Sequence, residues 1–173
     1  MPPHEQAPVT LLMGVSGSGK TAIGRRLAGR LAVPFLDADD LHSPGNLQKM
    51  RAGTPLTDAD RGPWLQAVAA ELVRATTATG GIVVACSALK RAYRDRLRAA
   101  TPSLRVVHLT AATDVIRRRL EARTGHFMPA ALLDSQLATL EPPGADERPI
   151  VVEVSRPVDA VVATIVAALD GGA

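Results

Sequence analysis

Gly14-Val15-Ser16-Gly17-Ser18-Gly19-Lys20-Thr21 is the stretch that decides the fold of this chain. It matches the pattern G-x-x-x-x-G-K-[ST], follows the apolar run Val9 to Met13 and precedes a helical pattern marked by Ile23 and Leu27. Glycines allow such a backbone to wrap a phosphate group, so that successive N–H groups and the helix N-terminus point at it. The stretch therefore predicts a phosphate-binding loop (P-loop) between a strand and a helix.

The residue types in this loop favour a nucleoside triphosphate with its magnesium ion. Lys20 can supply a mobile positive charge to the β- and γ-phosphates of ATP, and the Thr21 hydroxyl can ligate Mg²⁺. The alternative is a glycine turn that binds nothing. The nucleotide-binding residues that we predict in the loop are Gly14, Ser16, Gly17, Ser18, Gly19, Lys20 and Thr21.

Outward from the loop, short β-rich runs alternate with helical patterns along the chain, which is typical of a parallel sheet with crossover helices. We expect a three-layer α/β fold of the P-loop type, with one domain over residues 1–173. The last helix is clearly marked, because apolar residues repeat at helical spacing between Pro157 and Gly171. The five predicted strands are Val9 to Met13, Pro34 to Asp37, Gly81 to Cys86, Leu104 to Leu109 and Ile150 to Val154.

Composition argues against several other classes of protein. The net charge is only +3, and the sequence has no stripe of basic residues interleaved with aromatics, so we expect no nucleic-acid partner. No apolar run reaches the roughly 20 residues of a membrane span, and the single Cys86 cannot form an intramolecular disulfide. We therefore expect a cytoplasmic protein without a membrane partner.

Two acidic residues at the end of the second strand are the next candidates for chemistry. The carboxyl ends of parallel strands border the ligand crevice, and Asp37 and Asp39 alternate at strand spacing. One can then reach the Mg²⁺ shell, which we assign to Asp37, while Asp39 approaches an acceptor hydroxyl as general base. The alternative for Asp39 is a solvated acid that caps the next helix. A GTPase signature of the N-K-x-D type is absent.

Two long segments between the strands are candidates for substrate contacts. The first runs over about residues 41–80, begins with Ser43-Pro44-Gly45 and ends in a helix with Trp64 on its apolar face. The second, over about residues 117–143, combines an Arg-rich helix, a glycine break and a second amphipathic helix. Glycine and proline at both ends of a charged helical excursion are typical of a lid that closes over the active site.

Several sequence blocks resemble the gluconate kinase (gluconokinase) family, a relative of shikimate kinase. The resemblance runs in order from about Val9 to Val166. Its blocks are the P-loop GVSGSGK, DADDLH from Asp37, NLQKM from Asn46, GTPLTDADRGPWL from Gly53, CSALK from Cys86, YRD from Tyr93 and GHFMP from Gly125.

The resemblance implies the transfer of the γ-phosphate of ATP to D-gluconate, giving 6-phospho-D-gluconate and ADP. This product would feed the pentose phosphate or Entner-Doudoroff routes, and the family implies a homodimer. The resemblance also suggests that Arg119 or Arg123, four apart in the lid, closes over ATP as an arginine finger, and we assign Lys20, Asp39 and Arg123 as catalytic. The candidate gluconate-binding residues are Asp39, His42, Lys49, Arg61, Lys90, Arg94 and His126.

The candidate substrate residues also have structural explanations. His42 could brace the turn that follows it, and Arg61 could pair with Asp60 to hold the insertion together. Lys90 and Arg94 lie four apart on a predicted helix, so they could meet one anion or simply be solvated. His126 could contact a ligand or cap the lid turn.

The function itself also has alternatives at this point. One is another small-metabolite kinase of the shikimate or nucleoside-monophosphate type. The other is a nucleotide-binding regulatory module that phosphorylates nothing. The block from Asn46 to Leu65 resembles the gluconate family and not those relatives.

Overall fold

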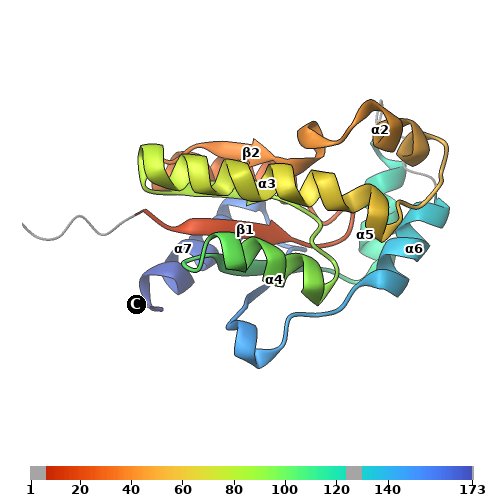
Figure 1. Cartoon of the computed structure of the whole chain (residues 1–173). Helices are drawn as coiled ribbons and strands as arrows, with labels where there is room; N and C mark the ends of the chain where they lie inside the picture. Colours follow the sequence, from red (N-terminus) through yellow and green to blue (C-terminus); the bar gives the residue numbers. More distant parts are fainter. Residues whose placement is uncertain (1–6, 124–129, 173) are drawn as a thin grey trace, which may run out of the picture.

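A computed structural model describes residues 7–123 and 130–172, and its framework is a five-stranded parallel sheet. The strands lie in the order β2-β3-β1-β4-β5 (Figure 1). β1 is central and wholly buried, and its Leu11 pairs with Val84 on one side and Val106 on the other. The bounds of the strands are β1 Val9–Met13, β2 Phe35–Asp37, β3 Ile82–Ala85, β4 Arg105–Thr110 and β5 Ile150–Glu153.

The five predicted strands are confirmed, and their ends differ from the prediction by one residue at most. The prediction began the second, third and fourth strands one residue early, at Pro34, Gly81 and Leu104. Proline has no backbone N–H to contribute to a sheet ladder. The Leu104 N–H instead donates to the Thr101 carbonyl and closes a turn before the strand begins.

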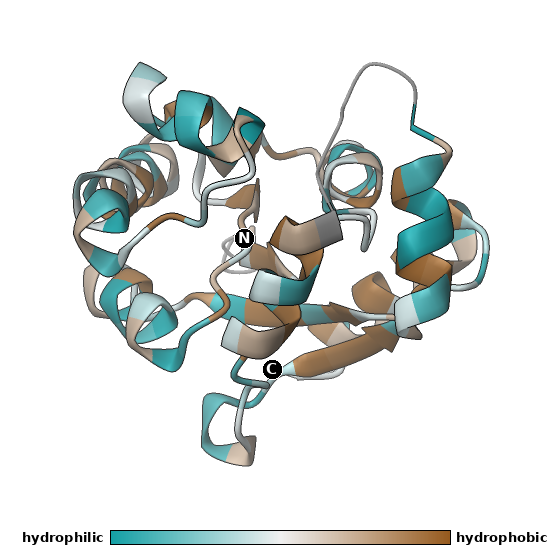
Figure 2. Cartoon of the chain, turned by 90° about the vertical axis from the view of Figure 1, so that its right-hand side faces the viewer, coloured by the Kyte–Doolittle hydropathy of each residue, from teal (hydrophilic) through white to brown (hydrophobic). Residues whose placement is uncertain are grey.

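Helices cover both faces of the sheet. On one face, α3 and α4 pack in a core that includes Val68 and Leu97, and on the other face α1 and α7 pack around Leu27 and Ile165. Figure 2 shows the largely hydrophobic strands between helices whose outer surfaces are mostly hydrophilic. The bounds of the helices are α1 Lys20–Leu31, α2 Pro44–Arg51, α3 Asp58–Thr79, α4 Arg91–Ala100, α5 Thr113–Glu121, α6 Ala130–Thr139 and α7 Val158–Asp170, with short 3₁₀ turns η1 Ala38–Leu41 and η2 Ala145–Glu147.

The N-terminus of α3 is held by a capping box. Thr57 is the N-cap residue, and its hydroxyl accepts a hydrogen bond from the Asp60 N–H, while the Asp60 carboxylate accepts one from the Thr57 N–H. The reciprocal bonds satisfy two N–H groups that lack partners within the helix. Asp58 is the first helical residue and accepts hydrogen bonds from Lys90 and Tyr93.

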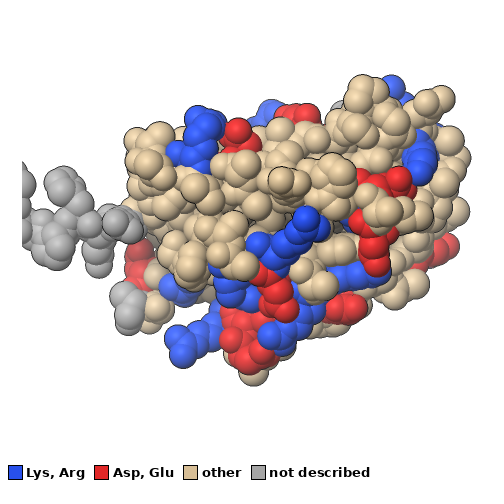
Figure 3. Space-filling model, in the orientation of Figure 1, with Lys and Arg blue, Asp and Glu red and all other residues tan. Residues whose placement is uncertain are grey.

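A buried ion pair ties α4 to the segment before β5. Arg94 and Glu147 are almost completely buried, and the guanidinium donates two hydrogen bonds to the carboxylate, at 2.8 and 2.9 Å. Arg94 also donates to the backbone carbonyls of Ala88 and Leu89, at the end of the loop that follows β3. Figure 3 shows acidic and basic side chains gathered on this face, over α4 and η2. The pair therefore connects three segments that are far apart in the sequence.

No helix within residues 7–123 and 130–172 is long and apolar enough to cross a membrane.

Neutralising Glu147 should destabilise the protein far more than neutralising an exposed carboxylate nearby. We expect Glu147→Gln to lower the free energy of unfolding by about 3 kcal/mol, because it leaves the Arg94 guanidinium buried without its counter-charge. Urea denaturation followed by circular dichroism measures this difference. The matched control is Asp95→Asn, which removes exposed pairs with Arg91 and Arg98 and should change the stability by less than about 1 kcal/mol. Equal effects of the two variants would contradict a structural role for the buried pair.

Candidate active site

The loop between β1 and α1 has the backbone of a phosphate-binding site. Gly17 and Gly19 have φ angles of 84° and 89°, in the left-handed region that glycine adopts at little cost. A Cβ atom at Gly17 would come within 3.0 Å of Ile116 and Leu120 on α5, so the loop also packs too closely there for a side chain. Gly19 is the N-cap of α1, and the first N–H groups of that helix have no partners within it. They are available to an anion such as a phosphate group.

The two side chains that end the motif are oriented by the loop and by β2. Lys20 Nζ donates to the backbone carbonyls of Gly14 and Val15, at 2.9 and 3.0 Å, so the ammonium lies over the loop. Burial lowers the pKa of Lys20, and the charge of nearby Asp39 opposes this effect. Thr21 Oγ1 donates to Asp37 Oδ2 at 2.7 Å. The predicted magnesium ligands Thr21 and Asp37 are therefore adjacent.

This pair of oxygen donors fits magnesium. Mg²⁺ usually takes one or two protein oxygens and completes its octahedron with water and phosphate oxygens. In the described part of the chain, no group of three or more His, Cys, Asp or Glu side chains could form an all-protein metal cage. A hydroxyl and a carboxylate beside a phosphate loop instead suit an ion that arrives with a nucleotide.

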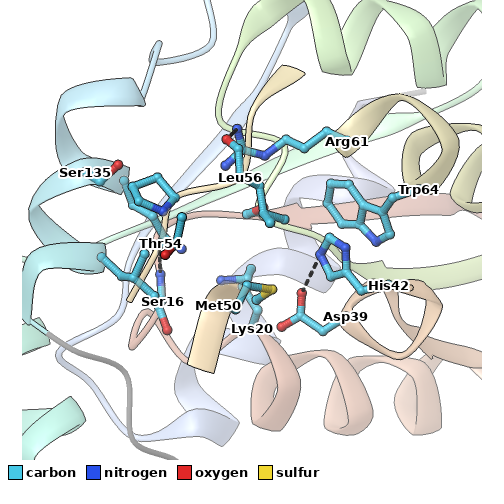
Figure 4. A pocket seen from close by; sticks show the side chains of 14 residues that line it. Ser16, Lys20, Asp39, His42, Met50, Thr54, Leu56, Arg61, Trp64 and Ser135 are labelled. Atoms are coloured by element: carbon cyan, nitrogen blue, oxygen red, sulfur yellow. Dashed lines mark hydrogen bonds and ion pairs between the residues drawn. The ribbon is translucent and has the colours of Figure 1, made fainter. Parts of the chain in front are cut away.

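A cavity beside the P-loop brings together several of the predicted catalytic and substrate residues. Lys20 and Asp39 lie at one side of it, and His42, Arg61 and Trp64 form another wall (Figure 4). The described residues that line it are Ser16, Lys20, Asp39, His42, Met50, Thr54, Pro55, Leu56, Arg61, Trp64, Ser87, Leu132, Ser135 and Gln136.

Asp39, the predicted general base, lines the cavity beside Lys20. It lies in η1, directly after β2, and 62% of its side-chain surface is exposed toward the open cavity. Desolvation by the surrounding protein raises the pKa of Asp39 above the usual value of an aspartate, and the charge of Lys20 partly offsets this shift. A carboxylate with a raised pKa is a better proton acceptor.

His42 is held rigidly beside Asp39. Its ring stacks on Trp64 with 4.3 Å between the ring centroids, and the Trp64 indole N–H donates to the Ala38 carbonyl at 2.7 Å. His42 Nε2 lies 3.8 Å from Asp39 Oδ1. The turn that follows His42 is capped by the Ser43 hydroxyl, which accepts from the Asn46 N–H. The turn thus has its own cap, and the His42 ring lies against the cavity.

The structure separates the predicted substrate cations. Arg61 lines the cavity and donates to the Leu56 carbonyl and to the Tyr93 hydroxyl, so the suggested pair with Asp60 is not formed. Lys49 takes that carboxylate instead, at 2.9 Å, and Lys90 pairs with Asp58 at 2.9 Å. Neither lysine belongs to the described lining of the cavity.

The prediction that Arg94 binds substrate is corrected by the structure. Arg94 is fully buried in its ion pair with Glu147 and points into the protein, whereas Lys90 lies outside with Asp58. The two side chains therefore do not meet one anion. The spacing of four residues was correct for a shared helix face, but Lys90 is the N-cap of α4 and its side chain follows another direction.

A second cavity lies on another side of the P-loop. Arg119 and Arg123 line it together with Gly17, Gly19 and Arg156. Arg119, in the last turn of the charged helix α5, donates a hydrogen bond to the Val154 carbonyl. Both predicted lid arginines thus lie beside the loop, in a cavity whose described lining does not include Asp39. The remaining candidate, His126, falls outside the described residues.

Sequence reasoning missed Gln136 as a functional residue. Its side-chain carbonyl accepts a hydrogen bond of 2.7 Å from the backbone N–H of Ser16 in the P-loop. Ser135 and Leu132, on the same helix α6, also line the first cavity. The signal was present in the sequence, because Gln136 is a polar residue on a helix face otherwise formed by leucines such as Leu133 and Leu137.

The protonation of His42 should make the stability of the protein depend on pH. Burial, together with the nearby charge of Arg61, lowers the pKa of His42 to about 4 in the folded chain, against about 6.5 when unfolded. Between these values the unfolded chain binds a proton that the folded chain does not, so stability falls as the pH drops from about 6.5 toward 4. Urea denaturation at pH 7 and pH 5 should show a larger loss for the wild type than for His42→Gln. Equal losses would contradict a buried neutral histidine.

Comparisons with known proteins identify the family of this chain. The model of a family described as an AAA domain matches residues 9–143. A gluconokinase of Gluconobacter oxydans (strain 621H) is 47% identical over 156 residues, which cover 90% of this chain and 88% of that protein. The crystal structure of a gluconokinase from Sinorhizobium meliloti 1021 is 43% identical, with a TM-score of 0.86, and the match covers 95% of this chain and 93% of that chain.

A more distant structure shares only the fold. Shikimate kinase from Acinetobacter baumannii is 17% identical with a TM-score of 0.64, and the match covers 97% of this chain and 96% of that one. The close relatives, by contrast, match over nearly the whole length at more than 40% identity. With its P-loop and the adjoining cavity, the chain belongs to the gluconokinase family of P-loop kinases.

Proposed function

We propose that this protein transfers the γ-phosphate of ATP to D-gluconate, giving 6-phospho-D-gluconate and ADP. The observation that carries the proposal is one cavity in which Lys20 of the P-loop lies with Asp39, His42 and Arg61. A phosphate loop beside a carboxylate and a cation suits an acceptor that has both hydroxyl groups and a negative charge. The names of the relatives supply the identity of that acceptor.

The P-loop would hold the triphosphate of ATP. The N–H groups at the start of α1 would face the phosphates, and Lys20 would move from the Gly14 and Val15 carbonyls to the β- and γ-phosphates. Thr21 and Asp37 would hold Mg²⁺, which neutralises phosphate charge when it is bound. Arg119 and Arg123, in the second cavity, would contact the nucleotide and offset the charge that develops during transfer.

The first cavity would orient gluconate for attack. Asp39 would accept the proton of the attacking hydroxyl, while that oxygen forms its bond to the γ-phosphorus and the bond to ADP breaks. The basic residues in the described lining of this cavity are Lys20, His42 and Arg61, and of these Lys20 is assigned to ATP and His42 is neutral. We therefore assign the gluconate carboxylate to Arg61. Lys49 would act indirectly, by holding Asp60 and so the start of α3.

The family resemblance also supports a broader proposal about the protein in the cell. We propose that residues 1–173 act as one domain, in a homodimer, in the cytoplasm. Light scattering on the purified protein tests the oligomeric state, and cell fractionation tests the location.

Release of ADP should depend on gluconate. In a coupled assay with Mg-ATP, we expect saturable ADP release with D-gluconate, and little with shikimate, other sugar acids, nucleoside monophosphates or no acceptor. A wrong acceptor would leave some buried polar groups of the site without a hydrogen-bond partner, and each such group costs about 1 to 3 kcal/mol of binding free energy. Activity with a different acceptor instead would contradict the assignment of gluconate as the substrate. A rate of ADP release that does not change with any acceptor would favour a regulatory module.

Substitutions of Asp39 and Lys20 should have different effects. We expect Asp39→Asn to lower kcat by about 10²- to 10⁴-fold and to leave ATP binding largely unchanged, because only proton acceptance is lost. Lys20→Ala should impair both turnover and ATP binding. Calorimetric titration with ATP and steady-state kinetics separate the two effects. Near-normal turnover of Asp39→Asn would show that the general-base assignment is wrong.

Arg61 should control the affinity for gluconate. We expect Arg61→Met to raise the KM for gluconate by about 10-fold or more while leaving the KM for ATP nearly unchanged, since a charge-assisted hydrogen bond contributes about 1.5 to 3 kcal/mol. Lys49→Met is the comparison variant, because it removes an exposed cation outside the cavity lining. A larger rise in KM for Lys49→Met would transfer the carboxylate contact to Lys49.

A further inference from the structure

A buried asparagine behind the first cavity is connected to Asp39 through His42. Asn46 lies in α2, is only 7% exposed and does not line the cavity. Its side-chain Nδ2 donates to the Asp60 carbonyl at 3.0 Å and lies 3.4 Å from His42 Nδ1. On the other side of the imidazole ring, His42 Nε2 lies 3.8 Å from Asp39 Oδ1 (Figure 4).

The Asp60 carbonyl decides which way the Asn46 amide points. A backbone carbonyl can only accept a hydrogen bond, so the NH₂ end of the amide must face it. The same NH₂ group is the neighbour of His42 Nδ1, and it has a second hydrogen to donate. His42 Nδ1 must therefore be the acceptor in this contact.

The tautomer of His42 follows from that contact. A neutral imidazole carries its proton on one nitrogen only, so an accepting Nδ1 leaves the proton on Nε2. The lowered pKa of His42 agrees with a neutral ring. Arg61 and Lys20 are the cations on the cavity side and Asp39 is the facing acid, while Asn46 and Trp64 cover the other sides of the ring. Stacking on Trp64 fixes the plane of the ring, so the Nε2–H is directed toward the carboxylate.

We propose that Asn46 is a positioning residue, which keeps His42 as an Nε2–H donor toward Asp39 and so orients the carboxylate for the acceptor hydroxyl. The separation of 3.8 Å is longer than a hydrogen bond, and such contacts commonly tighten when substrates bind. With one carboxylate oxygen held by His42, the other oxygen faces the cavity and can accept the proton. This inference rests on the proposed function of Asp39 as general base.

The tautomer can be measured without any substrate. Long-range ¹H–¹⁵N spectra of the full-length protein at pH 8 should show His42 with a proton-free Nδ1 and a protonated Nε2. The spectrum of His42→Gln identifies the His42 signals among those of the four histidines. A protonated Nδ1 in the wild type would overturn the proposal. Because this measurement needs no acceptor, it is unaffected if gluconate is not the substrate.

Reversing the polarity of the Asn46 side chain tests its effect on turnover. Asn46→Asp replaces the donor by an acceptor of nearly the same shape, so Nδ1 should become protonated and Nε2 should lose its proton. We expect kcat to fall by about 10- to 100-fold with both KM values little changed, as when a reacting group is misplaced by about 1 Å. Gln48→Glu, an exposed amide-to-acid change on the same helix, is the matched control and should keep kcat.

Each result with Asn46→Asp is decisive when its spectrum is recorded as well. An unchanged kcat with a proton-free Nε2 would overturn the proposal. If His42 in this variant carries protons on both ring nitrogens, the Nε2–H donor is still present, and the proposal then requires an unchanged kcat. A loss of kcat in that state would contradict it. Thermal unfolding of each variant shows that the protein is folded at the assay temperature.

A conservative replacement of His42 should restore the donor. Glutamine can place an amide N–H close to the position of Nε2, whereas leucine cannot. We expect His42→Gln to keep most of the wild-type kcat and His42→Leu to lose about 10- to 100-fold. Equal losses in the two variants would show that the ring acts by packing alone, and the proposal would be wrong. If the donor at Nε2 is the function of Asn46, adding Asn46→Asp to His42→Gln should change kcat little further.

Discussion

The active site depends on one backbone constraint, namely the wrapped loop by which β1, in the centre of the sheet, enters α1. Gly14 packs against the sheet so closely that a Cβ atom there would come within 2.8 Å of the Leu109 carbonyl. Gly17 and Gly19 need positive φ angles to aim the backbone and the start of α1 at the phosphate position. Since all five strands are parallel, their carboxyl ends meet at the same edge. The topology of the sheet therefore brings the residues that follow β2 close to the loop.

The walls of the acceptor cavity come from helices that the sheet does not position directly. The N-terminal part of α3 carries Arg61 and Trp64, and its first turn is held by the Thr57 capping box. Helix α6 reaches the same cavity from the other side, and Gln136 connects it to the Ser16 N–H. The proposed phosphate-binding loop and the proposed acceptor cavity thus both contact helix α6. A movement of α6 would therefore change the surroundings of the loop and the shape of the cavity together.

The polar contacts behind the cavity show how residues without access to substrate can influence the chemistry. Asn46 contacts the Asp60 carbonyl, and Asp60 in turn caps α3 and pairs with Lys49. These contacts place the His42 ring between Trp64 and the Asp39 carboxylate. Burial of a polar amide has a cost that hydrogen bonding must offset, and here both hydrogens of its NH₂ group have a partner. These two contacts fix which end of the Asn46 amide faces His42 Nδ1.

The sequence alone determined the P-loop, the five strands, the placement of the acids after β2 and the family, because these follow from local spacing and from blocks of residues in order. It could not determine which basic residues face the cavity. From the sequence, Arg94 and Arg61 are equally good candidates to bind the substrate. In the structure Arg94 is buried in an ion pair with Glu147, which lies 53 residues further along the chain. Arg61 instead lies at the cavity, where it donates to the Leu56 carbonyl and the Tyr93 hydroxyl. The same is true of Gln136 and Asn46, whose partners come from other elements. Only the tertiary structure decided these roles, because the burial and the partners of a polar side chain depend on contacts between segments that local spacing does not relate.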